Sequence, residues 1–159
     1  MSSARQHACA PLFQVRHTRT MSYQPLRIHP RADLRRALED AVRNEQGQTA
    51  FVVSGIGSLA NAKLRLAGAE SETSLTGSFE ILCLSGTLSL DGAHLHIAIA
   101  DTEGRVTGGH LCYGNEIRTT AEVLLARLSD WTLSRELDPE TGYQELVVSP
   151  ERPGKTGDA

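Results

Sequence analysis

The sequence predicts a single α+β domain with a largely antiparallel β-sheet and one main amphipathic helix. Only one long segment has helical periodicity, and the apolar segments after it are short, alternate with polar residues and end at turn residues. Strands that follow one another through short turns are typical of antiparallel sheets. The chain has 159 residues, which is enough for one sizeable core but too few for two ordinary domains.

Both ends of the chain differ in composition from its centre. Residues 1–20 contain three arginines and no acid, which is typical of a disordered tail and also of a transit peptide. The last residues are polar. We therefore expect a domain at 23–149, between a flexible N-terminal extension at 1–22 and a flexible C-terminal tail at 150–159.

Charge and composition exclude several classes of protein. The net charge is −3, and without the three arginines of residues 1–20 the chain holds 13 basic against 19 acidic residues, or −6. An acidic domain lacks the positive surface with which proteins bind nucleic-acid phosphates. No apolar run approaches the ~20 residues that span a bilayer. The three cysteines lie far apart and no signal-peptide core precedes them. We therefore expect a cytoplasmic protein without a framework of disulfides.

The helix is predicted at Asp33–Gln46. Asp33 can cap its N-terminus and Gly47 can end it. Its apolar residues recur at helical spacing and form one stripe that should pack on a sheet: Leu34, Leu38, Ala41 and Val42. The charged residues of the helix are expected to stay in solvent: Arg35, Arg36, Glu39, Asp40 and Arg43.

The other segments have the composition of β-strands. A short strand is expected at Leu26–His29, and a strand at Thr49–Ser54 should end at the glycine-rich break Gly55–Ser58. Phe79–Leu90 is expected to be divided at Ser85–Gly86. Further strands are predicted at Asn61–Leu66, Leu95–Ala100, Arg105–Thr107, Thr119–Leu128, Trp131–Leu137 and Tyr143–Val148. The periodicity of Thr119–Leu128 also fits a helix, and its threonines and valine favour the strand.

Two histidine-bearing motifs should fold face to face in a β-hairpin. The turn residues Asp101–Gly104 lie between an H-L-H motif and a G-G-H motif. A three-residue loop in this turn sets His96 opposite His110, and His94 lies on the same face because side chains alternate along a strand. A slip of one residue would separate the three rings. The two glycines of the second motif could instead host a bulge or allow another backbone to approach the sheet.

Three imidazoles on one surface are a common set of ligands for zinc or a similar divalent metal. His94, His96 and His110 are therefore candidate metal ligands, with zinc favoured; the alternative is that they fill a polar face or a subunit interface. The same register places Cys112 opposite His94 as a candidate further ligand. Glu122 is a candidate extra ligand or hydrogen-bond partner of an imidazole, although its position does not follow from the sequence.

Several longer motifs occur along the chain. They are V-S-G-I-G-S at 53–58, K-L-R at 63–65, L-T-G-S-F-E-I-L-C-L-S-G at 75–86, H-L-H at 94–96 and G-R-V-T-G-G-H-L at 104–111. Their content and order resemble the PPC domain, the plant and prokaryote conserved domain, in its stand-alone prokaryotic form. The resemblance covers roughly Leu26–Val148.

This resemblance implies a homotrimer of PPC-like α+β subunits, with a metal held by the three histidines near a subunit boundary. Plant members carry AT-hooks, which this sequence lacks, so DNA association would go through partners rather than direct binding. One segment is similar to a plant segment that contacts protein partners, and it consists of Gly77, Ser78, Phe79, Glu80, Ile81 and Leu82. Phe79 and Ile81 also suit an ordinary core.

The expected function is that of a cytoplasmic, trimeric binding or regulatory module with a zinc site and no catalysis of its own. The alternative is a small metal-dependent enzyme that activates water at the three histidines. A carboxylate such as Glu122 or Glu80 in a pocket beside the metal would favour the enzyme. A contiguous basic face with Arg65, Arg105 and Arg118 would favour DNA binding.

Overall fold

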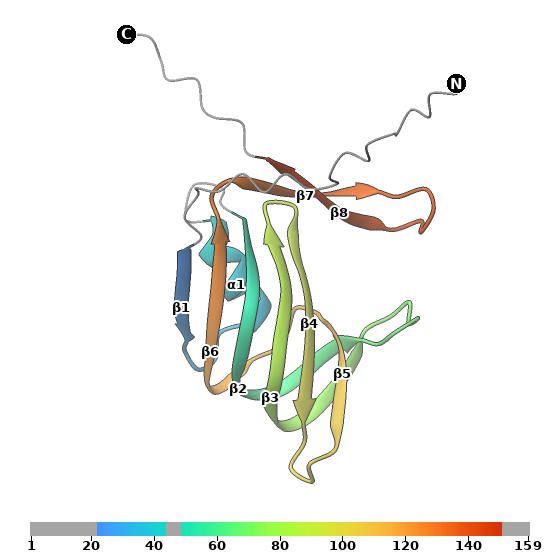
Figure 1. Ribbon diagram of the computed structural model, residues 1–159. Coiled ribbons are helices and arrows are strands. Elements are labelled where there is room, and N and C mark those ends of the chain that lie inside the picture. The colour runs from blue at the N-terminus through green and yellow to red at the C-terminus, as the bar shows by residue number, and fades with distance from the viewer. Residues whose placement is uncertain (1–21, 44–48, 151–159) are drawn as a thin grey trace, which may run out of the picture.

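The computed structural model describes residues 22–43 and 49–150 of the chain. They form a six-stranded antiparallel sheet in the order β1-β6-β2-β3-β4-β5, a helix and a two-stranded hairpin of β7 and β8 (Figure 1). The last residues of β2 also pair with β5, so β2 to β5 form a closed ring of paired strands. The elements are β1 (Ser22–Ile28), α1 (Leu34–Arg43), β2 (Thr49–Arg65), β3 (Thr73–Ser89), β4 (Gly92–Ala100), β5 (Val106–Leu111), β6 (Ile117–Leu128), β7 (Trp131–Leu137) and β8 (Gln144–Pro150).

The α+β architecture with an antiparallel sheet is therefore confirmed. No helix among the described residues is long and apolar enough to cross a membrane. The predicted extension and tail lie outside the described residues, except that Ser22 belongs to β1 and Pro150 to β8. The predicted C-terminal end of the helix, with Gly47, also lies outside them.

Helix α1 covers one face of the sheet and closes the core (Figure 1). Asp33 caps the helix, because its Oδ1 accepts the backbone N–H of Arg36 at 2.9 Å. Three members of the predicted stripe are buried, with Leu34, Leu38 and Val42 at 0% exposure, whereas Ala41 is half-buried. These side chains share one hydrophobic core with buried residues of the strands, among them Leu59, Leu64, Leu84, Leu95, Ile97, Ile99 and Leu125.

One charged residue of the helix is buried, contrary to the expectation that Glu39 stays in solvent. Its side chain is 3% exposed. The carboxylate accepts hydrogen bonds from Arg35 Nε at 3.1 Å, the Ala93 backbone N–H at 3.2 Å and the Tyr113 hydroxyl at 2.7 Å. The flank of α1 lies against the start of β4 and the loop after β5, and Glu39 joins all three segments.

Replacing Glu39 with alanine should lower the free energy of unfolding by about 3 kcal/mol, because Arg35 and Tyr113 lose a buried charged partner. Chemical denaturation measures this change. Asp40→Ala is the matched control, since the Asp40 side chain is 53% exposed and its loss should cost within about 0.5 kcal/mol. Equal effects of the two substitutions would contradict the role given to Glu39.

Two predicted interruptions are wrong, because β2 and β3 are long continuous strands. The chain does not break at Gly55–Ser58 but continues as one strand of 17 residues, and β3 passes through Ser85–Gly86 as another strand of 17 residues. Register shifts occur in β2 near Val53 and near Ser58. Bulges of this kind bend a strand without ending it, so the glycines allow curvature and close contact instead of a chain reversal.

The β7–β8 hairpin crosses the end of the sheet (Figure 1). Both predicted late strands are confirmed. Hydrogen bonds anchor the hairpin to the sheet. Thr49 Oγ1 donates to the Trp131 carbonyl at 3.0 Å, the Arg135 backbone N–H donates to Asp91 Oδ2 at 3.0 Å, and the Arg135 guanidinium donates to Thr87 Oγ1 at 2.8 Å. It therefore forms a wall above the upper ends of β3 and β4.

Candidate metal centre

The predicted hairpin register is present in the structure and brings three histidines together. His96 pairs directly with His110 across β4 and β5. His94 lies two residues before His96 and therefore shares its face, while Leu95 is buried on the opposite face at 1% exposure. The ring centroids of His96 and His110 are 4.5 Å apart, and that of His94 is 5.1 Å from each of them.

The glycines beside His110 allow a second backbone to approach. Gly108 and Gly109 pair with β4 in an unbroken register, so no bulge separates the histidines. A side-chain carbon on Gly109 would lie 2.7 Å from the carbonyl oxygen of Arg65. The end of β2 thus packs against the strand that carries His110. Of the two roles considered for these glycines, the structure shows the close approach of another backbone.

The spacing of the ring nitrogens suits a metal ion. One nitrogen from each ring lies within 4.8 Å of the others, and Nε2 of His94 is 3.1 Å from Nε2 of His96. Ligands of a tetrahedral zinc at the usual Zn–N distance lie about 3.3 Å apart. The His94–His96 distance is close to this value and the third nitrogen lies nearby, so the donor atoms and their spacing suit a divalent ion.

The surroundings of His94 and His110 favour the neutral form of these two imidazoles. Burial lowers the pKa of His94, and the charges of Arg135, His96 and His110 lower it further, while Glu145 opposes the shift. Burial and then the Arg65 charge lower the pKa of His110, although a hydrogen bond to the Arg65 backbone acts in the opposite direction. A neutral imidazole is the form that binds metal. A bond from the other ring nitrogen to a backbone group is common in metal-binding histidines.

These shifts predict how the stability of the metal-free protein depends on pH. The pKa values of His94 and His110 lie below the ordinary value of 6.5, so below that pH the unfolded chain binds protons that the folded triad does not. The free energy of unfolding should therefore fall as the pH decreases through 6.5, until the lowered pKa values are passed. Urea denaturation of chelator-treated protein between about pH 8 and about pH 5 measures this dependence.

His94→Gln tests the source of this pH dependence. The variant lacks one of the two shifted groups, so its stability should decline less over the same pH interval. A wild-type protein that becomes more stable on acidification through this interval would contradict the assignment, as would an unchanged slope in the variant.

Cys112 does not lie opposite His94. The β4–β5 ladder ends at the His96–His110 pair, and the chain then turns towards β2, where the Cys112 backbone N–H donates to the Lys63 carbonyl at 3.1 Å. The side chain is 7% exposed and its thiol contacts the His110 carbonyl at 3.7 Å. Burial raises the pKa of the Cys112 thiol. The structure therefore keeps this group neutral and outside the cluster of three ring nitrogens.

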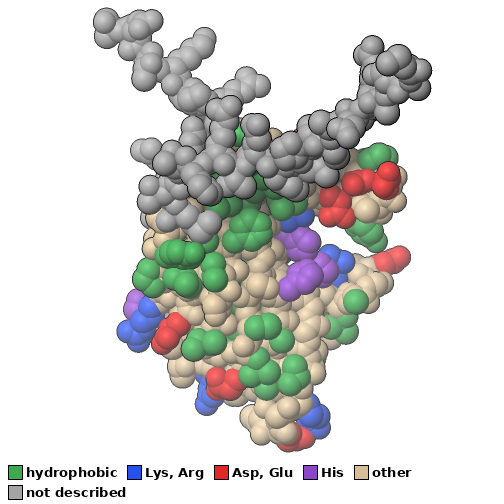
Figure 2. Space-filling model, viewed as in Figure 1, with side chains coloured by type: hydrophobic (Ala, Val, Ile, Leu, Met, Phe, Trp, Pro, Cys, Tyr) green, Lys and Arg blue, Asp and Glu red, His purple; other side chains and the backbone are tan. Residues whose placement is uncertain are grey.

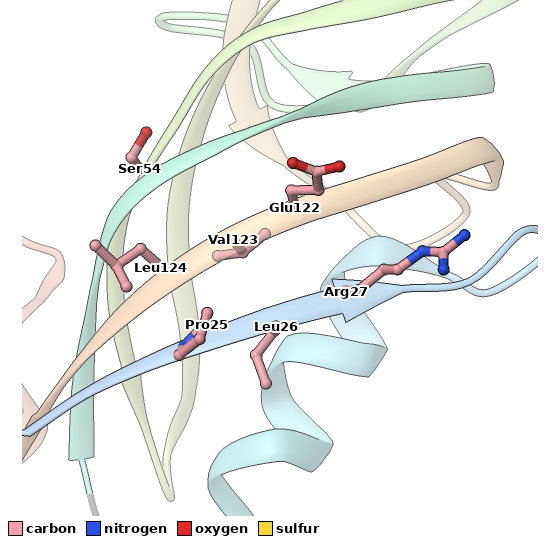
Figure 3. A pocket seen from close by; sticks show the side chains of 7 residues that line it. All are labelled: Pro25, Leu26, Arg27, Ser54, Glu122, Val123 and Leu124. Carbon is pink, nitrogen blue, oxygen red and sulfur yellow. The ribbon is translucent and has the colours of Figure 1, made fainter.

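Glu122 lies on a different part of the sheet. It belongs to β6, and β2 and β3 separate that strand from β4. Its neighbours across the two adjacent strands are Arg27 and Ile56. It lines an open depression of about 560 Å³. Figure 3 shows that Leu26 points towards α1, whereas Glu122 points away from the helix. The structure does not bring this carboxylate to the histidines.

The segment predicted to contact partners, 77–82, lies in β3 and alternates between the two sides of the sheet. Phe79 is 8% exposed and Ile81 is 4% exposed, so both belong to the core. Glu80 is exposed, and Leu82 is 50% exposed. Only the outward residues of this segment are available to a partner.

A cavity of about 770 Å³ adjoins the triad, and sequence reasoning did not predict it. Its walls come from α1, the end of β2, the start of β4 and the β7–β8 hairpin, and they include Arg65, Arg135 and Glu145. Figure 2 shows histidine side chains beside a hollow under the hairpin, with basic side chains next to them. These residues come from separate parts of the chain, so no local motif could have predicted them.

Comparison with known proteins identifies the family. The Plants and Prokaryotes Conserved (PCC) domain model matches residues 16–129, which includes all three histidines. The chain belongs to this family. It is the family that the motifs in the sequence resemble, and the β7–β8 hairpin follows the matched residues.

Solved structures share the fold of this PCC-family chain. A hypothetical protein from Salmonella enterica is 38% identical, with a TM-score of 0.81 over 86% of this chain and 99% of that one. A metal-containing protein from Archaeoglobus fulgidus is 27% identical, with a TM-score of 0.71 over 85% of this chain and 99% of that one.

A curated relative of this PCC-family chain is a much longer protein. The bifunctional protein GlmU of Synechococcus sp. strain JA-3-3Ab is 44% identical over 149 residues, which is 88% of this chain. This chain spans 24% of the length of that relative.

Proposed function

We propose that His94, His96 and His110 bind one divalent metal ion, with zinc favoured, in a cytoplasmic PCC domain that acts as a trimeric binding or regulatory module. The observation that carries this proposal is the convergence of three ring nitrogens within 4.8 Å on two paired strands. Rigid paired strands hold ligands more precisely than loops do. The Archaeoglobus relative, which is described as metal-containing, supports the proposal.

The donor set favours zinc over the harder cations. Imidazole suits zinc, copper, iron and nickel, whereas magnesium and calcium prefer carboxylate and carbonyl oxygens. Zinc with three histidines keeps a fourth position for water or a ligand. The neighbouring cavity is lined by His94 and His110, so a ligand bound there would lie beside the proposed metal.

Elemental analysis tests the proposal. Protein stripped with a chelator, reloaded with zinc and then dialysed should retain one zinc per chain. The ion should remain through gel filtration and leave on renewed chelation. Wild-type protein that retains no metal after this treatment would refute the site.

The trimer has a candidate surface on the side of the sheet away from the core. Val53, Ile56 and Leu82 are 50%, 53% and 50% exposed on the neighbouring strands β2 and β3. An exposed apolar patch of this kind is typical of an interface between proteins. Light scattering of the wild type should give three times the chain mass of 17.2 kDa.

Ile56→Asp should shift that mass towards the monomer, because it places a charge in the buried contact. Leu137→Asp, at a 66% exposed position near the tip of the β7–β8 hairpin, should leave the mass unchanged. A monomeric wild-type protein would contradict the trimer.

Association with DNA, in this proposal, goes through protein partners. Arg105 is engaged by acids in the β4–β5 turn, at 2.8 Å from Asp101 and 2.6 Å from Glu103. Glu80 is an exposed residue of β3 that does not belong to the proposed trimer surface, so it is available for partner contacts. A labelled DNA duplex should therefore not bind the purified protein at physiological salt.

The cavity favours one second candidate, a metal-dependent hydrolase. Glu145 lines the cavity beside His94 and could accept a proton from water bound at the open metal position. This candidate requires zinc-dependent turnover of an activated ester, with loss of turnover in Glu145→Gln and retention of zinc. Absence of any zinc-dependent turnover would exclude the hydrolase and favour the binding or regulatory module.

A further inference from the structure

We propose that the cavity beside the triad binds a small molecule through an anionic oxygen-bearing group, a carboxylate or a phosphate. One oxygen of this group occupies the open position on the metal, and the others accept hydrogen bonds from Arg65 and Arg135. The inference rests on the proposed metal site and adds the chemical class of its ligand.

Arg65 is placed beside the triad by the closure of the sheet. It is the last residue of β2 and pairs directly with His110 of β5. Directly opposed residues share a face with their Cβ atoms about 5 Å apart, so the Arg65 side chain starts beside the His110 ring and lines the cavity. Its guanidinium has no hydrogen-bond or ion-pair partner among the described residues. It is free to bind a ligand.

Arg135 reaches the triad from the β7–β8 hairpin. Its guanidinium donates to Thr87 Oγ1 at 2.8 Å, and Thr87 is the direct neighbour of His94 across β3 and β4. Its other terminal nitrogen makes a long contact of 3.4 Å with the Gln144 carbonyl. The guanidinium is therefore fixed beside His94 and retains N–H groups for a ligand. Two arginines thus flank the triad, one beside His110 and one beside His94.

Most other charged groups of the cavity are already engaged. Arg35 donates to the Leu111 and Ala93 carbonyls at 2.9 and 2.8 Å and to Glu39, so its guanidinium joins α1 to the sheet. Among the acids, Glu72 pairs with Lys63 at 3.4 Å, Asp91 accepts the Arg135 backbone N–H, and Glu145 accepts the Thr141 hydroxyl.

The net charge of the cavity with metal bound is positive. The three arginines and three acids of its lining cancel, and neutral imidazoles leave the two charges of the ion uncompensated. An arginine fork matches the geometry of carboxylate and phosphate oxygens.

The dimensions indicate a small molecule. A cavity of about 770 Å³ is within the range of sites for metabolite-sized ligands. The β7–β8 hairpin contributes Arg135 and Glu145 to the wall of the cavity.

Cobalt-loaded full-length protein provides the test, because the visible spectrum of cobalt(II) reports its coordination. Inorganic phosphate and malonate are titrated separately in the millimolar range. At least one of them should change the cobalt spectrum with saturation. Arg65→Gln should weaken that anion at least about tenfold without changing the cobalt content, since it removes a charged hydrogen-bond donor. Arg135→Lys should weaken it while keeping the charge, because the planar fork is lost.

Arg118→Gln is the matched control, since Arg118 is exposed on β6 and does not line the cavity. It should bind both anions as the wild type does. Tighter binding of phosphate would assign a phosphorylated ligand, and tighter binding of malonate a carboxylate. If cobalt binds but neither anion changes its spectrum, or if Arg65→Gln binds as the wild type does, the inference is overturned and the metal site stands. Failure of cobalt to bind would overturn both.

Discussion

Replacement of His96 with alanine is expected to weaken zinc binding by more than about 100-fold, which exceeds the loss that follows from removal of a hydrogen-bond partner of a ligand. His96 is the central member of the triad, since it pairs with His110 and its Nε2 lies 3.1 Å from Nε2 of His94. Without it, two imidazoles remain to hold the ion. Competition with a chromophoric chelator measures the affinity, and denaturation of the metal-free variant checks that the fold is intact.

His29→Ala is the control for this experiment. His29 is exposed, follows β1 and does not belong to the cluster of three. Its replacement should leave the zinc affinity unchanged. An unchanged affinity in His96→Ala would mean that zinc binds elsewhere, whereas an equal loss in both variants would point to a nonspecific histidine effect.

Gly86→Ala is expected to destabilise the protein by about 4 kcal/mol or more. Gly86 has a φ of +140°, and a Cβ at this position would lie 2.0 Å from the carbonyl oxygen of His94. The contact is with backbone, so relief requires β3 and β4 to move apart. Gly86 pairs with Leu95, between the two histidines of β4, so the same displacement should also lower the zinc affinity.

Gly104→Ala separates the steric clash from the cost of a positive φ. Gly104 has a φ of +78° in the β4–β5 turn, and a Cβ there would meet nothing within 4 Å. Its replacement should cost about 1 to 2 kcal/mol. Denaturation midpoints and zinc affinities of the two variants give the comparison. Similar losses of stability in both would show that strand contact at Gly86 is not critical.

The features that could be predicted from the sequence are those set by neighbouring residues. The helix follows from the spacing of Leu34, Leu38 and Val42 and from the cap at Asp33. The facing of His96 and His110 follows from a short turn and the two-residue period of strands, and the structure confirms it. In both cases a segment of fewer than about twenty residues contains the whole signal.

The features that could not be predicted depend on contacts between distant segments. Glu39 looks like a surface residue in its helix, but Tyr113 and Ala93 bury it. Arg65 joins the triad only because the end of β2 pairs with β5. Cys112 lies outside the triad for the same reason, since the chain turns towards β2 after the last β4–β5 pair.

The central claim is that the three histidines share one metal ion, and anomalous X-ray scattering tests it most directly. Crystals of the zinc-loaded protein are measured just above and just below the zinc absorption edge. The expected result is one anomalous difference peak per chain, equidistant from the ring nitrogens of His94, His96 and His110 and present only above the edge. A peak elsewhere, or no peak among these rings in protein that contains zinc, would contradict the claim.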